Sequence, residues 1–453
     1  MRMKTIIKPF HETNGCELKI PQSLYQRINH ANGSNEMHFT FGKRSVPIQF
    51  QSGGDRLEIN KQLASELLIP FEDHPIHMNY DVQNKELKLG PVIALLTAEN
   101  CHRPHGEPFG AAGSFFKEMA RYCIQKGFFF YVVPLQAPHN DEPLFGCRWV
   151  KDRWVKENLP YPNAIYNRIT SRKLEKSEEA KALFNAFQKH HVPIFNERFL
   201  NKWEVYNALQ CEPVLIPHLP KTILYRQASD LDSMLQNHAV IFAKPITGSL
   251  GKGIIKITHS NGNYTVQYSH QSLAQHREYR LLPLLRATMP ALKRQPYLIQ
   301  QGIEPLTFNG QPTDFRILLN KNQTGVWQVT SIVARRSANE RIVSNVAMGG
   351  SLHRPEQLLS AWFTKHEQKA ISKLLVELSL QCVKTIEQHC QGTFGEFGID
   401  LLIDEHGKPW ILEVNTKPSK TEDATAITMN RSIRPSTKAL IHYAAFLSGF
   451  EFD

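Results

Sequence analysis

The chain has 453 residues, of which 41% are hydrophobic and 21% are charged, and its formal net charge is +11. This length and composition describe a globular protein of roughly two to four domains with ample core. The longest apolar run, residues 127–133, is far too short to span a bilayer, and the N-terminus lacks the apolar segment of a secretory signal. We therefore expect a cytoplasmic protein without membrane insertion.

The positive charge fits an anionic ligand, a nucleic acid or an anionic surface. The basic residues are spread along the chain, however, and they form no basic and aromatic platform, so we expect no nucleic-acid partner. The seven cysteines are an odd number, lie far apart and include no CxxC pair. This pattern suits free thiols in a reducing compartment rather than a disulfide framework or a structural zinc site.

Residues 1 to about 89 predict a small β-rich domain. Short alternating segments between residues 37 and 60 are broken by Gly42, Pro47 and two further glycines, and a short helix follows at 61–68. No catalytic constellation stands out here. We interpret this part as a scaffold or docking module.

An α/β domain is predicted from residue 90 to residue 200. The continuous apolar run at 91–98 is typical of a buried parallel strand, and a helix at 113–127 and a second apolar strand at 128–135 follow it. Strand, helix and strand in this order predict a βαβ unit.

Two groups of polar residues follow strands of this α/β domain. Cys101, His102 and His105 lie in the loop after the first strand, where a substrate-facing loop is favoured over a metal site, because open α/β sheets bind ligands there. Asn167 and Arg168 lie in the strand-like segment AIYNRI, residues 164–169, which a basic turn follows. They could contact an anion or be ordinary surface residues.

A helix is predicted at 202–210, and the lysine in its first turn is unusual. Asn201 is a good N-cap, and Glu204 completes a variant of the capping box. The charge of Lys202 opposes the helix dipole, whereas a bound phosphate would favour both the helix N-terminus and the lysine. The alternative is a long side chain that bends away into water.

A glycine-rich loop connects two strands between residues 239 and 257. An apolar strand ends at Lys244, and the loop after it contains Gly248, Ser249, Gly251 and Gly253. Such loops expose backbone N–H groups that can wrap phosphate oxygens. This is not the Walker loop, since a strand rather than a helix follows it. The pattern predicts a flap over a phosphate group or an ordinary mobile hairpin loop.

Three further segments predict strands and a loop with polar residues. Residues 297–303 predict a strand that ends in polar residues, and residues 313–319 predict one with Asp314 and Arg316 on the same face. A hairpin turn leads to a strand that ends at Arg335 and Arg336. The loop after this strand contains Ser344, Asn345, Gly349 and Gly350. We expect a long amphipathic helix at about 356–390 and a final helix at about 436–448.

The stretch from residue 394 to residue 420 predicts a β-hairpin. Residues 396–403 and 409–415 alternate with the period of a strand, and residues 405–408 are typical of a turn. With a four-residue loop, Asp404 pairs with Pro409. The same register pairs Leu402 with Ile411 and Asp400 with Glu413.

The pairing of Asp400 with Glu413 predicts a metal site. Two like charges directly opposite each other repel and destabilise a sheet, so a bound cation would offset the repulsion. Mg²⁺ is usually held by one or two carboxylates together with substrate phosphates. Asn415 shares the face of Glu413 and could add its amide oxygen. The alternative is a solvent-facing edge with separated carboxylates.

The order of these motifs resembles an ATP-grasp domain. Over residues 200–453 the chain is similar to the glutathione-synthetase-like and ribosomal-protein-S6-modification-like branch. Over nearly its whole length it resembles the endospore coat-associated YheC/YheD family of ATP-grasp proteins. That closer resemblance rests on GPVIALLT followed by PFGAAGSFFKE, on YPNAIYNRI, LNKWEVYNAL, KPITGSLGKGI, QQGI with DFR, IVSNVAMGG and EVNTKPS.

The resemblance implies a fold of mixed α+β and α/β class. The small β-rich domain at 1–89 would precede an α/β pre-ATP-grasp domain at 90–200 and an ATP-grasp domain at 201–453. A lid subdomain would span about 217–300.

The resemblance also implies a nucleotide site. Lys202 and Lys244 would bind the ATP phosphates, and the loop of Gly248, Ser249, Gly251 and Gly253 would close over them. The strand with Gln300, Gln301 and Ile303 would contact adenine, although this chain has Gln-Gln-Gly-Ile where the related branch often has Gln-Glu-Phe. Asp314 would lie near the ribose and nucleotide.

The metal and catalytic residues follow from the same resemblance. Asp400, Glu413 and Asn415 would hold Mg²⁺, with Mn²⁺ as the alternative. Arg316 and Arg335 would act with Lys244 on the transferred phosphate and the acyl group.

The resemblance therefore implies a ligase that uses ATP and Mg²⁺ to join a small-molecule or peptide carboxylate to an amine or similar nucleophile through an acyl phosphate. The alternative is a non-catalytic ATP-binding structural or assembly protein associated with the spore coat. Dimers and tetramers are common in such enzymes, so a homo-oligomer fits either interpretation. We expect substrate specificity from residues 90–200, near His102, His105 and Arg168, and from the loop at 344–353.

Overall fold

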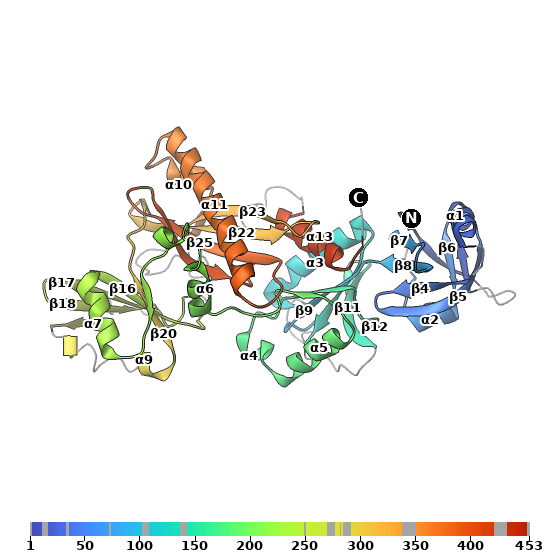
Figure 1. Cartoon of the computed structure of the whole chain (residues 1–453), viewed down its shortest axis with the longest axis horizontal. Helices are drawn as coiled ribbons and strands as arrows, with labels where there is room; N and C mark the ends of the chain where they lie inside the picture. The colour runs from blue at the N-terminus through green and yellow to red at the C-terminus, as the bar shows by residue number, and fades with distance from the viewer. Residues whose placement is uncertain are drawn as a thin grey trace. The chain divides into compact units, whose positions relative to one another are not determined.

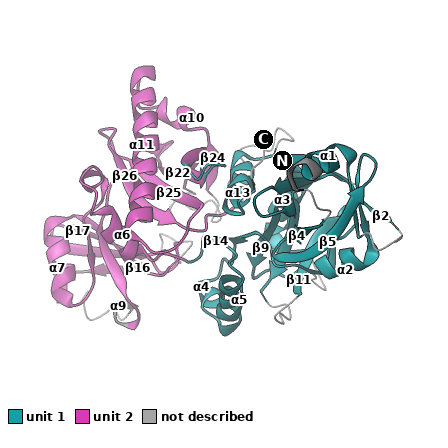
Figure 2. Cartoon of the chain, turned by 45° about the vertical axis from the view of Figure 1, so that its right-hand side comes forward, with its two compact units in different colours: residues 1–198, 321–326, 432–453 teal, residues 199–320, 327–431 magenta. Residues whose placement is uncertain are grey.

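The computed structural model forms two compact units (Figure 2). It describes residues 2–10, 17–32, 36–71, 74–101, 108–135, 143–248, 251–269, 277–280, 282–283, 291–337, 350–420 and 433–450. The first unit consists of Met1–Arg198, Lys321–Val326 and Ser432–Asp453, and the second of Phe199–Asn320 and Trp327–Arg431. The C-terminal segment belongs to the first unit, although the sequence predicts one domain over 201–453. The three-domain division stays a prediction.

The first unit begins with an eight-stranded sheet in the order β1-β7-β8-β4-β5-β3-β6-β2 (Figure 1). Its strands are β1 (Arg2–Thr5), β2 (Ile7–Phe10), β3 (Leu18–Ile20), β4 (Glu36–Phe41), β5 (Arg44–Ser52), β6 (Leu57–Asn60), β7 (Ile76–Asp81) and β8 (Glu86–Gly90). Two helices accompany it, α1 (Gln22–Asn32) and α2 (Lys61–Leu67). The β-rich character predicted for this part is confirmed.

A second sheet of this unit has the order β12-β11-β10-β9-β13-β14. Its strands are β9 (Val92–Thr97), β10 (Phe129–Pro134), β11 (Leu144–Val150), β12 (Arg153–Leu159), β13 (Ala164–Asn167) and β14 (Ile194–Phe195). The apolar strands β9 and β10 are parallel and α3 (Gly113–Lys126) connects them, so the predicted βαβ unit is confirmed. The other helices are η1 (Gly110–Ala112), α4 (Arg172–Glu175), α5 (Glu178–Lys189) and α13 (Pro435–Leu447).

The second unit contains an antiparallel sheet in the order β15-β20-β16-β17-β18-β19. Its strands are β15 (Thr222–Leu224), β16 (Val240–Pro245), β17 (Ile255–Ser260), β18 (Asn263–Tyr268), β19 (Arg277–Tyr279) and β20 (Tyr297–Gln301). Its helical elements are η2 (Ile216–His218), α7 (Ala228–Asn237) and α9 (Ala291–Arg294). Leu231 and Leu235 of α7 share a buried core with Ile241 of β16 and Ile299 of β20.

The other sheet of the second unit has the order β24-β23-β22-β25-β26, with β21 paired to β22. Its strands are β21 (Thr307–Phe308), β22 (Gln311–Lys321), β23 (Trp327–Arg336), β24 (Ser351–His353), β25 (Glu396–Ile403) and β26 (Pro409–Asn415). Ile317 and Ile399 share a buried core with Leu375 of a long helix. The helices are α6 (Lys202–Leu209), α10 (Pro355–Leu359) and α11 (Lys365–His389). Side chains at the intervening positions of β22 and β25 therefore point to the opposite face of the sheet, which is polar.

The single helix predicted at 356–390 is two helices, α10 and α11. Thr364 breaks the run because its hydroxyl oxygen accepts a bond from the backbone N–H of Glu367, and the Glu367 carboxylate accepts one from Thr364 N–H at 2.8 Å. This capping box starts a new helix. The final helix predicted at 436–448 is confirmed as α13.

The expectation that all cysteines are free is wrong for one pair. Cys101, in the loop after β9, and Cys147, in β11, form a disulfide. Their positions are 46 residues apart in the sequence, so no spacing rule could relate them. Among the described residues, Cys123, Cys211, Cys382 and Cys390 are free.

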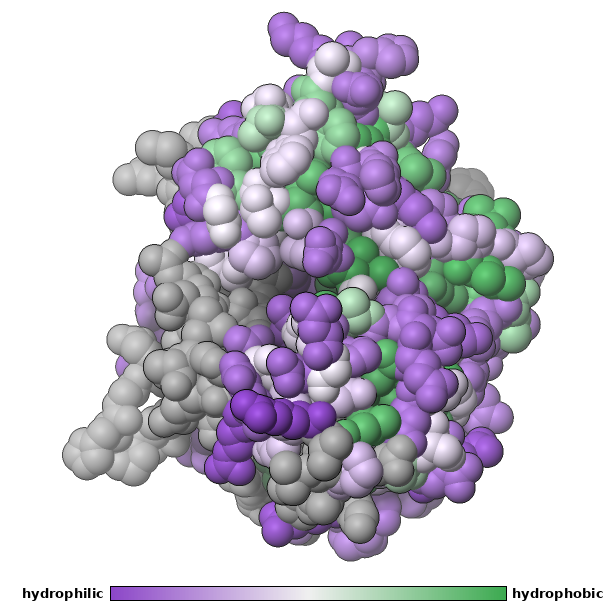
Figure 3. All heavy atoms as spheres, turned by 90° about the vertical axis from the view of Figure 1, so that its left-hand side faces the viewer, coloured by the Kyte–Doolittle hydropathy of each residue, from purple (hydrophilic) through white to green (hydrophobic). Residues whose placement is uncertain are grey.

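The described residues include no helix that combines the length and the apolar character needed to cross a membrane. Figure 3 shows a face of the molecule on which polar side chains dominate and hydrophobic ones form small groups. Three large hydrophobic residues of the second unit are exposed, Val214, Ile216 and Trp362. Scattered residues of this kind are normal on a protein surface.

Candidate functional site

The hairpin of β25 and β26 places two carboxylates opposite each other, as predicted. Asp400 is the cross-strand partner of Glu413. The register near the turn differs from the prediction by one residue, because Ile403 rather than Asp404 pairs with Pro409. The pairing of Leu402 with Ile411 is likewise wrong.

A β-bulge restores the predicted pairing. Ile411 and Glu413 both have partners in β25, while Leu412 between them is the extra residue. Without the bulge, Glu413 would share the core face with Ile411, because side chains alternate along a strand. In the structure Ile411 and Val414 are buried, and Glu413 and Asn415 are on the other face, where they are partly accessible. The bulge thus turns Glu413 toward the polar face.

Asp400 is held by two arginines. Arg316 is its cross-strand partner in β22, and the guanidinium forms two bonds with the carboxylate, from Nε to Oδ1 and from Nη2 to Oδ2, the latter at 2.9 Å. Arg335 Nη2 lies 3.2 Å from Asp400 Oδ1. Burial alone would raise the pKa of Asp400, but the two guanidinium groups outweigh it and lower the pKa to about 2. The group is therefore a carboxylate at neutral pH.

Arg335 connects Asp400 to a second acid. Its Nε and Nη2 donate to the two carboxylate oxygens of Asp314 at 2.6 and 2.8 Å. This forked geometry is the strongest form of an ion pair between side chains. Asp314 and Arg316 do lie on the same face of β22, as the sequence predicts, since both contact this cluster.

Lys202 at the start of α6 reaches the same cluster. Its Nζ contacts Glu413 Oε1, 211 residues away in the sequence, and lies 3.3 Å from the carbonyl oxygen of Gly248. The helix begins as predicted, because Asn201 Oδ1 accepts the N–H of Glu204 at 2.9 Å. The alternative in which Lys202 bends into water is wrong, because Glu413 attracts its ammonium group.

Lys244 is the second-last residue of the apolar strand β16 and is partly buried. Its Nζ lies 2.5 Å from Gln300 Oε1, and Gln300 Nε2 donates to Thr222 Oγ1 at 3.0 Å. Burial lowers the pKa of Lys244 to about 8; Glu413 opposes this shift and Lys202 adds to it. The neutral amide of Gln300 does not compensate the ammonium charge as a carboxylate would.

The glycine loop between β16 and β17 lies beside these lysines. Gly251 and Gly253 have φ of 71° and 76°, the left-handed region that favours glycine. A Cβ on Gly248 would lie 3.0 Å from Pro245 Cγ, a tight approach. Ser249 lies outside the described residues. The arrangement is that of the predicted strand–loop–strand flap.

The predicted adenine contacts are less direct. The side chain of Gln300 faces Lys244, and Gln301 Oε1 accepts the backbone N–H of Lys221 at 3.1 Å. Ile303 is half-buried just after β20. The role of these residues and of Asp314 toward a nucleotide stays a prediction.

The predicted metal ligands come together on this face. Asn415 Nδ2 lies 3.4 Å from Asp400 Oδ2, and Glu413 is the cross-strand partner of Asp400. Carboxylate and amide oxygens suit Mg²⁺, which keeps positions for substrate phosphates. The part of the chain that the structure describes contains no group of three or more His, Cys, Asp or Glu side chains arranged to hold a metal ion. Two carboxylates and an amide therefore fit a metal that binds together with phosphate.

Several other residues that the sequence singles out as candidate site residues lie outside this cluster or outside the described residues. His102, His105, Ser344, Asn345 and Gly349 are outside the described residues. The metal alternative for Cys101 is wrong, since this residue is in a disulfide.

The alternative that Asn167 and Arg168 are ordinary surface residues is wrong, because both are buried at the C-terminal end of β13. Asn167 Nδ2 donates to the carbonyl oxygen of Glu197 at 3.0 Å. Whether these residues contact an anion stays a prediction.

Sequence reasoning missed two groups near this face. Thr222, which positions Gln300, gives no local signal, because 78 residues separate the two. Glu396 and Lys420 form a buried ion pair at the other end of β25. The ion pair could have been suspected from the sequence, because Glu396 lies four residues before Asp400, on the same face of a strand whose other residues are apolar.

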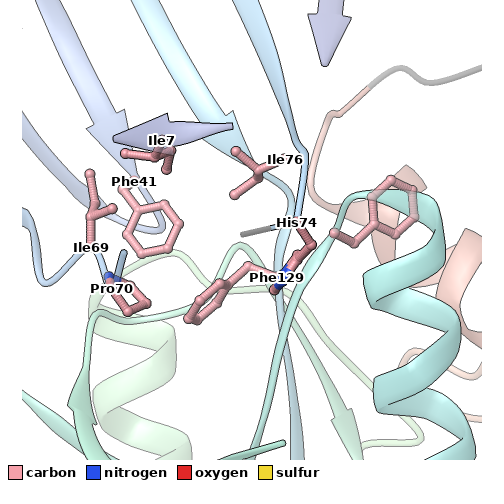
Figure 4. A pocket seen from close by; sticks show the side chains of 8 residues that line it. Ile7, Phe41, Ile69, Pro70, His74, Ile76 and Phe129 are labelled. Carbon is pink, nitrogen blue, oxygen red and sulfur yellow. The ribbon is translucent and has the colours of Figure 1, made fainter. Parts of the chain in front are cut away.

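A pocket in the first unit is a weaker candidate (Figure 4). Its free volume of about 20 Å³ is enough for roughly one water molecule. Its lining is apolar except for one histidine and consists of Ile7, Phe41, Ile69, Pro70, His74, Ile76, Phe128 and Phe129. Neither its size nor its lining suits a nucleotide.

Comparisons with known proteins give one family. The model described as YheC/D like ATP-grasp matches residues 191–447. The endospore coat-associated protein YheD of Bacillus subtilis (strain 168) is 28% identical over 435 residues, which cover 93% of this chain and 91% of that protein. The endospore coat-associated protein YheC of the same strain is 25% identical over 271 residues, 59% of this chain and 73% of that protein.

A solved structure is similar at a lower level. The D-alanyl-alanine synthetase A of Vibrio cholerae O1 biovar eltor str. N16961 is 12% identical, with a TM-score of 0.43 over 79% of this chain and 98% of that chain. At this TM-score the likeness carries no argument about the site.

Proposed function

Because the chain belongs to the YheC/D-like ATP-grasp family, we propose that it is a ligase that uses ATP and Mg²⁺ to join a carboxylate to an amine or a similar nucleophile. Its fold is the ATP-grasp fold, with the ATP-grasp region in the C-terminal part of the chain. Members of the ATP-grasp family are ATP-dependent carboxylate–amine ligases.

One observation carries the proposal beyond family membership. Lys202 at a helix N-terminus, Glu413 of the β26 bulge and the carbonyl of Gly248 meet at one point. A helix N-terminus, a lysine and a glycine loop are three separate features that bind phosphate. The carboxylate adds the ligand that a phosphate-bound metal needs. Their meeting supports a site for a metal–nucleotide complex.

The nucleotide would bind by exchange of ionic partners. In the structure Glu413 holds Lys202, and Asp400 holds Arg316. Phosphate oxygens would take over the cations, which frees both carboxylates for the metal. Lys244 would bind phosphate as well, and backbone N–H groups of the loop at 248–253 would wrap the phosphate oxygens. We assign the adenine and ribose contacts to Gln300, Gln301, Ile303 and Asp314.

Asp400, Glu413 and Asn415 would hold Mg²⁺, with Mn²⁺ as the alternative. When bound, such an ion neutralises charge on the phosphate oxygens. Arg316 and Arg335 lie next to these ligands and would stabilise the charge that develops on the transferred phosphoryl and acyl groups.

The proposed reaction has two displacements. A carboxylate oxygen of the acid attacks the γ-phosphorus of ATP, the bond from that phosphorus to the bridging oxygen breaks, and ADP leaves. The amine then attacks the acyl carbon, the bond from carbon to the phosphate oxygen breaks, and phosphate leaves as the amine loses a proton. Neither displacement needs a nucleophile from the protein, so catalysis is positioning and charge stabilisation.

ADP release tests this proposal. The purified chain is incubated with ATP, Mg²⁺ and mixtures of small acids and amines, and ADP and the coupled product are measured. The proposal predicts more than one equivalent of ADP per protein molecule only when both an acid and an amine are present. A Glu413→Gln variant with wild-type circular dichroism should lose the activity by at least about 100-fold. Wild-type turnover in that variant would contradict the assignment of Glu413 as a metal ligand.

A second function has a specific observation in its favour. Both B. subtilis relatives are named as endospore coat-associated proteins. We propose as the alternative that this chain binds ATP in a spore coat assembly without ligating anything. ATP binding without ADP release over a broad panel of acids and amines would favour this alternative.

A further inference from the structure

Glu396 and Lys420 form a buried ion pair in the second unit. The Glu396 side chain is 0% exposed and the Lys420 side chain 5%. Glu396 begins β25, and Lys420 lies five residues beyond the end of β26. Neither residue has a role in the proposed chemistry.

The carboxylate of Glu396 is also linked to β22 and, through a side chain of β22, to β23. Asn320 of β22 is its cross-strand partner, and Asn320 Nδ2 donates to Glu396 Oε1 at 3.2 Å. Asn320 Oδ1 in turn accepts the hydroxyl of Thr330, in β23, at 2.6 Å. The ion pair therefore fixes Lys420 to a rigid polar network that crosses three strands.

Residues 416–420 lie across the polar face of β25. A Cβ on Gly398 would lie 2.8 Å from Pro418 Cβ and 3.3 Å from Arg316 Cδ. Because Gly398 has no side chain, it leaves the space that Pro418 occupies. This space lies next to Arg316, which binds Asp400. A side chain at this position would lift the segment off the strand.

The segment is fixed at both ends. Asn415 contacts Asp400 at one end, and Lys420 contacts Glu396 at the other. Asn415 is the cross-strand partner of Gly398, two residues from Glu396 along β25. From there the segment runs toward the start of β25, where Pro418 covers Gly398 and Lys420 binds Glu396. Lys420 thereby fixes the chain that leaves Asn415.

A buried ion pair is a poor device for stability alone. Removing two charges from water costs several kcal/mol for each ion, and well-packed apolar residues often replace such a pair without loss of stability. The directed contact between the carboxylate of Glu396 and the ammonium group of Lys420 fixes where Lys420 lies on β25. The ion pair thereby fixes the position of Asn415, the predicted amide ligand of the metal site.

We propose that Glu396 and Lys420 are positioning residues that hold Asn415 beside Asp400 and thereby set the affinity of the site for its divalent cation. This inference rests on the proposed function. Groups that orient metal ligands from outside the coordination sphere typically change metal affinity by about 10–100-fold when they are replaced.

The test measures metal affinity and nucleotide affinity separately. Mn²⁺ is titrated into the full-length protein saturated with a nonhydrolysable ATP analogue, and free Mn²⁺ is followed by electron paramagnetic resonance. Binding of the analogue without metal is measured by calorimetry. The main variant is the double substitution Glu396→Gln and Lys420→Met, which removes both charges, keeps the shapes and leaves no lone buried charge.

The proposal predicts a separation of the two affinities. The double variant should bind Mn²⁺ about 10–100-fold more weakly than wild type, whereas metal-free binding of the analogue should stay within about threefold. Lys420→Arg keeps the charge and should restore wild-type Mn²⁺ affinity. The matched control is Arg148→Met with Glu157→Gln, which removes a partly buried ion pair of the first unit with 7% and 28% exposed side chains and should leave Mn²⁺ affinity unchanged.

Three outcomes would overturn the proposal by itself, and a fourth would overturn it together with the proposed function. The first is wild-type Mn²⁺ affinity in the folded double variant. The second is an equal loss in the control pair, which would show a general effect of lost charge. The third is a wild-type protein that binds the analogue but no Mn²⁺, which contradicts the metal site itself. A wild-type protein that binds neither ligand contradicts the proposed function, and the positioning role falls with it.

Discussion

Lys244 differs from the other cations of the site in the group that it contacts. Lys202, Arg316 and Arg335 contact carboxylates, whereas Lys244 contacts the neutral amide of Gln300. Burial lowers its pKa to about 8. A triphosphate beside this lysine would favour its charged form and raise the pKa toward the usual value.

We therefore predict that ATP binding takes up a proton above pH 8. At pH 8.5 Lys244 is about three quarters neutral in the free protein and charged in the complex, so uptake should be about three quarters of a proton per nucleotide. Calorimetry in buffers of different ionisation enthalpy measures this number. Lys244→Met should abolish the uptake. Equal binding enthalpies in all buffers for the wild type would contradict the prediction.

Arg316 also supports a stability prediction. Arg316→Met leaves Asp400 buried with much less compensation, which should destabilise the protein by about 3–5 kcal/mol in urea unfolding. The control is Lys373→Met, in a pair whose side chains are 78% and 58% exposed, and it should change stability by less than about 0.5 kcal/mol. Similar effects of both substitutions would show that Asp400 does not depend on Arg316.

At the scale of elements, the packing of α13 on α3 includes a titratable pair. His442 Nε2 and the hydroxyl of Tyr122 lie 2.8 Å apart. Burial, with help from Lys126 and Lys438, lowers the pKa of His442 to about 4. The unfolded chain, with a pKa near 6.5, binds the proton more readily, so stability is present above pH 6.5 and is lost as the pH falls toward 4.

This sign gives a pH prediction. His442→Gln cannot titrate, so the decrease in unfolding free energy between pH 6.5 and 4 should be smaller in the variant, by about 1–2 kcal/mol after allowance for solvent screening. Urea unfolding at several pH values measures it. An unchanged slope between pH 6.5 and 4 would mean that His442 already carries its proton in the folded protein.

The β25–β26 hairpin shows what alternation can and cannot predict. Alternating residues identified both strands and the opposition of Asp400 and Glu413. The turn was placed one residue off, and the bulge at Leu412 compensated for that error. A bulge adds one unpaired residue without a residue type that marks it, so pattern reading alone could not find it. The boundary between α10 and α11 could have been predicted from the sequence, because Thr364 and Glu367 have the spacing of a capping box.

At the scale of the whole chain, sequence distance limits prediction. Lys202 contacts Glu413 across 211 residues, and Arg316 contacts Asp400 across 84. No periodicity relates such pairs. The family resemblance supplied the expectation that they share a site, and the structure brings them together on one face. The pairing of Cys101 with Cys147 had neither kind of support, and it was missed.

The net charge of +11 has a specific interpretation at this scale. Three cations of the site, Lys202, Arg316 and Arg335, are already paired with Glu413, Asp400 and Asp314 in the structure, whereas Lys244 contacts a neutral amide. Mg²⁺ cancels part of the negative charge that a triphosphate brings, so the nucleotide leaves less buried charge uncompensated with the metal than without it. The central claim is therefore that the site binds the nucleotide more tightly with Mg²⁺ than without it.

Calorimetry of ATP binding, with and without Mg²⁺, tests this claim most directly on wild type, Lys244→Met and Glu413→Gln. We predict tight binding to wild type that depends on Mg²⁺ and is weakened at least about tenfold in both variants. Thermal unfolding should confirm that the variants fold. Wild-type protein that does not bind ATP, or that binds it equally well without Mg²⁺, would contradict the account.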